Sequence, residues 1–177
     1  MRTFLILSLA ALSIASVQAN DGQVTVNFSN VEDYTDFKPS SGIEERFQSQ
    51  RQAELSQYFN ELAKQLPSGQ QLSVTVTDID LAGRLEPTFG QSASNFIRIV
   101  RSIDYPSIAF TYQLRDSAGT LLREDSVQLQ DMNFDFDSVA RKRAGYDSLF
   151  YEKKMLKGWF NKTFEKVSSV SQPAESA

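Results

Sequence analysis

Residues 72–83 read Leu-Ser-Val-Thr-Val-Thr-Asp-Ile-Asp-Leu-Ala-Gly, and they begin as a β-strand with one apolar face. That face consists of Leu72, Val74 and Val76. The phase then changes, because Asp78 and Asp80 take the parity of the earlier apolar residues. The next apolar residues, Ile79 and Leu81, take the parity of the polar ones. A strand buries both apolar sets on one side only if a bulge or a break separates them, so this segment predicts such an irregularity.

The N-terminus has the pattern of a secretory signal peptide. Arg2 precedes an apolar run over residues 4–15, and Val17-Gln18-Ala19 forms a small-x-small cleavage site. The run is shorter than the roughly 20 apolar residues that a spanning helix needs, although a membrane anchor or a buried core helix is the alternative interpretation. No cysteine follows the site, which excludes the lipid attachment of bacterial lipoproteins. We therefore predict cleavage after Ala19, export, and a mature chain without a membrane span.

The chain contains neither cysteine nor histidine. This composition excludes disulfides, thiolate chemistry, Ser-His and Cys-His nucleophile systems, and most zinc sites. An enzyme built from this sequence would depend on carboxylates, lysine, tyrosine or a bound metal. We predict no cofactor.

A strand, a helix and a second strand follow the leader. Residues 23–28 alternate as a strand, and apolar residues recur at helical spacing over residues 43–66. Ser41 and Glu44 have the spacing of a capping box at the start of this helix. Because a βα crossover returns the chain in the same direction, the strands at 23–28 and 72–81 are expected to be parallel.

The middle of the chain predicts a loop, a strand and a hairpin. Residues 85–94 contain proline and glycine, as loops do, and residues 95–101 are apolar on both parities. The second pattern predicts a strand covered on both faces, or one that crosses the sheet. Residues 107–114 and 121–129 flank a tight-turn sequence and predict a hairpin. Its second strand carries consecutive charges, which is typical of an edge strand.

A second long helix is predicted from about Ser148 to Lys166, with a short helix capped by Asp137 or Ser138 before it. Gly158 within the long helix indicates a close backbone contact.

These elements define the fold class as α+β, with a mixed sheet of about five strands in the order β-α-β-β-β-β-α and two helices packed on one face. The predicted domains are a signal peptide over residues 1–19, a single α+β domain over residues 20–166 and a disordered tail over residues 167–177.

Asp78 and Asp80 are the candidate chemical pair. On one side of a strand, two such carboxylates would raise the pKa of one of them, or would hold Ca²⁺ or Mg²⁺ with help from Asp131. The structural alternative is that they hydrogen-bond the amides of the following turn. Glu152 and Lys153 project into the apolar arc of the second long helix, where charges need partners, and Lys153 is the expected counter-ion of Asp78 or Asp80.

The charge of the chain is uneven. Residues 20–137 carry 18 acidic and 9 basic side chains, whereas residues 138–166 carry 8 basic and 3 acidic ones. Solvated helix faces commonly look like this. The sharper hypothesis is a partner-binding basic patch formed by Arg141, Lys142, Arg143, Lys154 and Lys157. An exported, overall acidic domain without a nucleic-acid motif predicts no nucleic-acid role.

The chain resembles a family of exported Gram-negative bacterial proteins catalogued as domain of unknown function 3016. The resemblance rests on residues 72–83 and on Ile97-Arg98-Ile99-Val100-Arg101, the strand from Tyr105-Pro106 to Leu114, Leu129-Gln130-Asp131-Met132-Asn133-Phe134, Tyr151-Glu152-Lys153 and Trp159-Phe160. It implies export to the periplasm and brings no catalytic residues, because this family has no assigned activity.

Two functions follow as hypotheses. The first is a non-enzymatic binding or adaptor module that contacts an envelope protein or an anionic envelope component through the sheet edge or the basic helical region. The second is a carboxylate-based metal-binding protein or small hydrolase centred on Asp78 and Asp80. The absence of histidine and cysteine favours the first, since general acid–base catalysis benefits from groups that titrate near neutrality.

Overall fold

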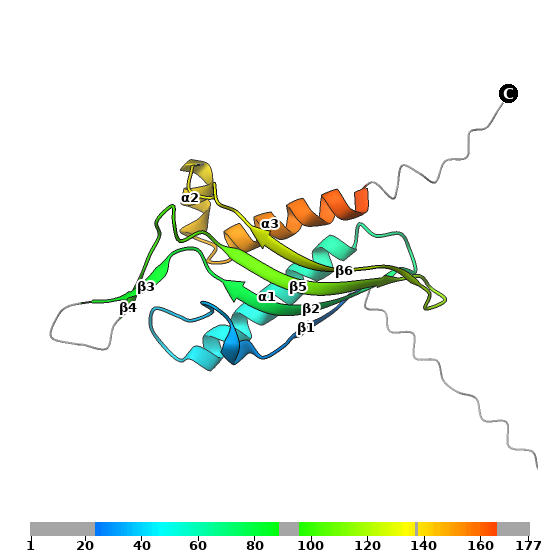
Figure 1. Cartoon of the computed structure of the whole chain (residues 1–177), viewed down its shortest axis with the longest axis horizontal. Helices are drawn as coiled ribbons and strands as arrows, with labels where there is room; N and C mark the ends of the chain where they lie inside the picture. The colour runs from blue at the N-terminus through cyan, green and yellow to red at the C-terminus, as the bar shows by residue number, and fades with distance from the viewer. Residues whose placement is uncertain (1–23, 89–95, 137, 166–177) are drawn as a thin grey trace, which may run out of the picture.

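The computed structural model describes residues 24–88, 96–136 and 138–165 of the chain (Figure 1). The predicted signal peptide and C-terminal tail lie outside these residues. The strands are β1 (Val24–Phe28), β2 (Gln71–Asp80), β3 (Arg84–Pro87), β4 (Phe96–Ile99), β5 (Ser107–Arg115) and β6 (Leu121–Gln130). The helices are α1 (Glu44–Ala63), α2 (Ser138–Ala144) and α3 (Phe150–Phe160), with a 3₁₀ turn at Val31–Asp33 and a π turn at Asn161–Glu165.

The main sheet has four strands in the order β1-β2-β5-β6, and α1 and α3 cover one of its faces (Figure 1). β1 runs parallel to β2, as the βα crossover predicts, and the other pairs are antiparallel. β5 and β6 form the predicted hairpin, with β6 at the edge. The α+β class is confirmed. The main sheet has four strands rather than about five, because β4 pairs with β3 in a separate two-stranded sheet.

The phase change in β2 is a β-bulge, as the sequence predicts. Val76 lies opposite Phe110 and Asp78 lies opposite Ala109, so Thr77 is the extra residue. After the bulge, Ile79 is fully buried and shares the covered face with Val76. Asp78 and Asp80 are thereby turned to the opposite, uncovered face.

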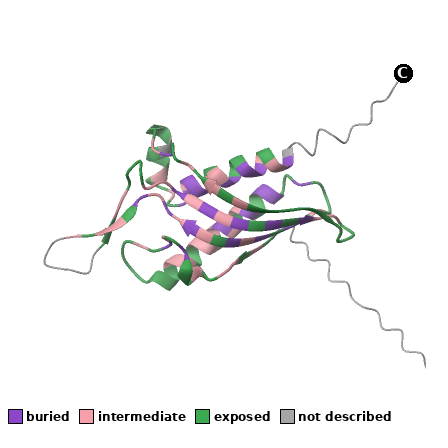
Figure 2. Ribbon diagram, viewed as in Figure 1, coloured by how far each residue is buried: buried purple, intermediate pink, exposed green. Residues whose placement is uncertain are grey.

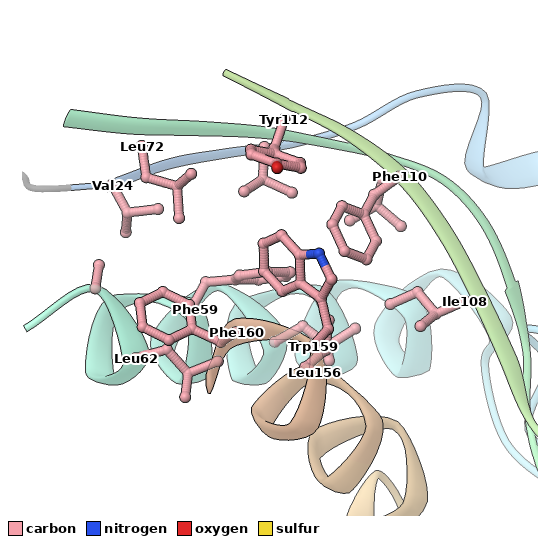
Figure 3. Close-up of a cluster of buried hydrophobic side chains, with 14 of the residues drawn as sticks. Val24, Phe59, Leu62, Leu72, Ile108, Phe110, Tyr112, Leu156, Trp159 and Phe160 are labelled. Carbon is pink, nitrogen blue, oxygen red and sulfur yellow. The ribbon is translucent and has the colours of Figure 1, made fainter. Parts of the chain in front are cut away.

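The main core lies between the covered face of the sheet and the two helices (Figure 3). Trp159 of α3 is at its centre, in edge-to-face contact with Phe110 at 4.8 Å and Tyr112 at 5.1 Å between ring centroids. Burial is concentrated in this layer (Figure 2). The other face of the sheet is polar, so no helix needs to pack on it. Its side chains include those of Ser73, Thr75, Thr111, Gln113, Glu124 and Ser126. No helix in the described ranges is long and apolar enough to cross a membrane.

The start of α1 differs from the prediction. Its N-cap is Ile43, without a side-chain hydrogen bond, so Ser41 and Glu44 form no capping box. A capping box needs Ser41 at the N-cap, but the helix begins two residues later, so that Glu44 is its first residue. Ile43 is 64% exposed instead of packing with the apolar face of the helix.

Residues 85–88 and 96–101 also differ from the prediction, and residues 89–95 of the predicted loop lie outside the described residues. Part of the predicted loop is strand β3, and β4 is not covered on both faces, since Phe96 is 48% and Ile97 47% exposed. The apolar residues here belong to a projecting two-stranded ribbon. α3 ends at Phe160 and continues as the π turn. Gly158 makes no close contact, because a Cβ added there would meet nothing within 4 Å.

Candidate functional site

Four carboxylates gather where β2 leaves the main sheet, and we call Asp36, Asp78, Asp80 and Asp104 the carboxylate cluster. The bulge directs Asp78 and Asp80 to the uncovered face. Asp36 arrives from the loop after β1, which runs beside the end of β2. Its backbone N–H donates to the Ile79 carbonyl at 3.2 Å, and its carbonyl accepts from the Leu81 N–H at 3.1 Å.

Asp78 and Asp36 both hold local structure. The Asp78 carboxylate accepts hydrogen bonds from the Thr35 N–H at 2.7 Å and the Thr35 hydroxyl at 2.8 Å. The Arg98 guanidinium donates to both carboxylate oxygens of Asp36, at 2.8 and 2.9 Å. It also donates to the carbonyls of Gly83 and Lys38. Arg98 therefore ties β4 to the loop after β1 through three hydrogen bonds and to the residue before β3 through a fourth.

Asp80 differs from Asp36 and Asp78 because no described residue hydrogen-bonds its carboxylate. Its pKa is raised to about 6, first by burial and then by the negative charges of Asp36 and Asp78, against which the Arg98 charge acts. The sequence predicted that the charge of one aspartate in this pair would raise the pKa of the other, and Asp78 has this effect on Asp80, although burial raises that pKa more. Asp80 therefore changes charge in mildly acidic solution.

Asp80 opens onto a hollow of about 480 Å³ between the end of the main sheet and the base of the β3–β4 ribbon. The hollow is lined by Thr35, Asp36, Asp80, Gly83, Arg84, Leu85, Ile103, Asp104, Tyr105, Ser107 and Gln130. Asp104 lies 3.9 Å from Arg84 and 4.0 Å from Arg101, and its Oδ2 atom is buried without a hydrogen bond. A hollow with these groups suits a polar or cationic molecule better than an apolar one.

Asp131 does not line this hollow. One of its carboxylate oxygens accepts from the Asn133 N–H at 3.2 Å, and the other accepts from the Lys154 ammonium at 3.0 Å. Across residues 24–88, 96–136 and 138–165, no group of three or more acidic side chains is arranged to hold a metal ion. The predicted trio with Asp78 and Asp80 is thus not brought together.

Lys153 is not the counter-ion of Asp78 or Asp80, and this expectation was wrong. Its ammonium donates to Glu54 at 2.5 Å and to Asp147 at 2.9 Å. The reason is the layer order: α3 packs on the covered face beside α1, whereas both aspartates lie on the opposite face of the sheet.

Glu152 is 1% exposed, and neither of its carboxylate oxygens makes a hydrogen bond. Burial raises its pKa to about 7, although the nearby backbone of Ala82 and the Arg98 charge favour the ionised form. The sequence placed Glu152 on a buried face correctly, but the partner that such a charge needs is absent from the described residues.

The predicted basic patch is exposed but divided between two helices. Arg141, Lys142 and Arg143 lie on α2, and Lys154 and Lys157 lie on α3. All five side chains belong to exposed residues. Lys154 is engaged by Asp131.

Sequence reasoning missed the exposure of large apolar side chains near one end of the molecule. They include Phe96, Ile97, Val100, Ile103, Met132, Phe136, Val139 and Tyr146. Two projecting units carry most of them: the β3–β4 ribbon, which we call the arm (residues 84–87 and 96–99), and α2 with its flanks (Figure 1). The available signal was the lack of a single apolar parity in residues 95–101, which we interpreted as a strand covered on both faces or one that crosses the sheet.

The fold and the site define a small α+β domain with a one-sided sheet and a carboxylate cluster that mostly secures loops. Residues 22–162 match the family model described as Protein of unknown function (DUF3016), and the chain belongs to this family. No curated protein and no solved structure matches the chain.

Proposed function

We propose that the protein is a non-enzymatic binding or adaptor module of the cell envelope, exported to the periplasm with residues 1–19 as its leader. It contacts its partner through the end that bears the arm and α2. The observation that carries this proposal is the exposure of large apolar side chains on both projecting units. Contiguous exposed apolar surface marks interaction sites in soluble proteins.

The base of the arm is fixed, as a preformed binding element requires. The Arg98 hydrogen bonds hold β4 in place, and Gly83, directly before the arm, has φ of +85°. A Cβ at Gly83 would lie 2.6 Å from the Ile99 carbonyl oxygen, so only glycine allows the two strands to approach this closely. A rigid element loses little conformational entropy on binding.

In-cell photo-crosslinking tests the proposal. A photoreactive residue at Ile97 in the arm or at Tyr146 beside α2 is expected to give a discrete adduct that contains an envelope component. The matched control is Leu122, which is 48% exposed near the turn between β5 and β6. The adduct should be identified by mass spectrometry and reproduced with the purified component. Equal labelling at Leu122, or no discrete adduct at the other two positions, contradicts the proposal.

A second candidate function is a carboxylate-based metal-binding protein or small hydrolase centred on Asp78 and Asp80. The observation in its favour is the unpaired Asp80 carboxylate at the hollow. Thermal melts with and without millimolar Ca²⁺ or Mg²⁺ test it, because a ligand at 100 times its Kd stabilises a fold by about 2.7 kcal/mol. A metal-dependent shift that Asp80→Asn abolishes supports this function. An unchanged melting temperature argues against it.

A further inference from the structure

We propose that α2 and its flanking aromatic residues dock the protein on a bilayer surface rich in anionic phospholipid. The docking element, which we call the α2 surface, consists of Phe136, Arg141, Lys142, Arg143 and Tyr146. This inference rests on the proposed function, for which it names one partner.

The α2 surface stands away from the main core. α2 lies next to α3 and contacts it (Figure 1). Ala144 packs on a small second core built around Phe134 and Tyr151. The two rings of that core meet edge to face, 4.9 Å apart between centroids. One side of α2 is therefore anchored, while its basic side chains extend into solvent.

Exposed aromatic residues flank the helix at both ends. Phe136 is 78% exposed two residues before α2, and Tyr146 is 87% exposed two residues after it. The Tyr146 N–H donates to the Arg143 carbonyl at 2.9 Å, which fixes the chain at the end of the helix. Aromatic rings beside basic side chains are typical of elements that lie at the membrane–water interface, where the rings reach the headgroup level.

The charges of α2 are available for an external anion. Within the part of the chain that the structure describes, no carboxylate forms a salt bridge with Arg141, Lys142 or Arg143. Lys153 and Lys154, by contrast, are held by acidic neighbours. The whole chain carries a net charge of −4, so an anionic surface repels most of the protein and attracts this element. That asymmetry would orient the molecule with α2 toward the bilayer.

A bilayer suits this surface better than a folded acidic partner does. α2 projects from the body (Figure 1), and a protruding helix matches a planar, deformable surface. Each basic residue near an anionic bilayer contributes roughly a fivefold gain in affinity, so three give about 100-fold.

Vesicle co-sedimentation of the purified protein tests the inference. We expect binding to vesicles of equimolar phosphatidylglycerol and phosphatidylcholine, and none to phosphatidylcholine alone. Binding should weaken as salt is raised. R141Q/K142Q/R143Q should lower the affinity about 100-fold. The matched control R46Q/K64Q/K162Q removes the same charge from exposed positions elsewhere and should bind as the parent does. F136S/Y146S should also weaken binding, with circular dichroism showing that each variant is folded.

Equal binding by the two triple variants, or equal binding to both vesicle types, overturns the inference. Failure of this inference is distinguishable from failure of the proposed function. If vesicles do not bind but Tyr146 still crosslinks to an envelope protein in cells, the lipid partner is wrong and the adaptor function stands. If neither result is obtained, both are wrong.

Discussion

Glu152 places a carboxyl group in the protein interior, where neither of its oxygens makes a hydrogen bond. A carboxylate without hydrogen bonds in the protein interior is disfavoured relative to the neutral acid, and its pKa of about 7 against the usual 4.5 expresses this preference. Glu152 holds its proton more tightly in the folded state than in the unfolded state. Its contribution to the free energy of unfolding is therefore fully present below about pH 4.5. It is lost as the pH rises toward 7.

Glu152→Gln is therefore expected to stabilise the protein, and more so at high pH. The gain in the free energy of unfolding should grow by roughly 2 kcal/mol between about pH 5.5 and about pH 8.5, since one pKa unit is worth about 1.4 kcal/mol. Urea unfolding at both pH values measures it. Glu61→Gln, at an exposed position of α1, serves as the control and should show no such trend. If Glu152→Gln instead destabilises the protein equally at both pH values, the carboxylate has a partner and its burial is not the dominant effect.

At the scale of the element, sequence periodicity predicted the parts that bury one clear face. α1, the β5–β6 hairpin and α3 each present a single apolar stripe to the core, and such stripes are visible without knowledge of their neighbours. The arm could not be predicted in this way. Residues 96–99 carry apolar side chains on both faces of the strand. A strand buried on both faces and a strand exposed on a projecting ribbon both fit this pattern.

The carboxylate cluster was predictable in part, for a related reason. Asp78 and Asp80 were visible because they interrupt a pattern within one strand. Asp36 and Asp104 were not, because their proximity depends on how two loops cross the end of β2. The ion pair of Lys153 was mispredicted since the choice of partner depends on which face of the sheet each element occupies. Periodicity shows which side chains share a face of an element, but it does not show which other element packs against that face.

At the scale of the whole molecule, the extra residue Thr77 determines which side chains of β2 face the helices and which face the uncovered side of the sheet. β2 lies between β1 and β5, and its buried residues support both halves of the core. Because of the bulge at Thr77, the apolar residues of β2 before it and after it both face α1 and α3. The carbonyl of Val76, within the bulge, accepts from the Tyr34 hydroxyl at 2.8 Å and the Ser29 N–H at 3.0 Å, so the loop after β1 is fastened there.

Deletion of Thr77 is consequently expected to be tolerated, whereas deletion of Thr75 is not. Without Thr77 the strand alternates regularly, and Val76 and Asp78 keep their neighbouring partners Phe110 and Ala109. The expected cost is about 1 kcal/mol, for disturbed hydrogen bonds to the fastened loop. Without Thr75 the strand can regain its register only by losing the bulge, which turns Val76 to solvent and Thr77 into the core.

That second deletion should cost roughly 3 kcal/mol more than the first, because a buried valine contributes about 1.5–3 kcal/mol and an unpaired buried hydroxyl costs about 1–3 kcal/mol. Urea denaturation of the two deletion variants, followed by near-ultraviolet circular dichroism, measures the difference. Thr77→Ser keeps the bulge and should match the parent protein. If the two deletions destabilise the fold equally, the bulge is not what keeps Val76 and Ile79 on the same covered face, and the sheet must hold its register by other contacts.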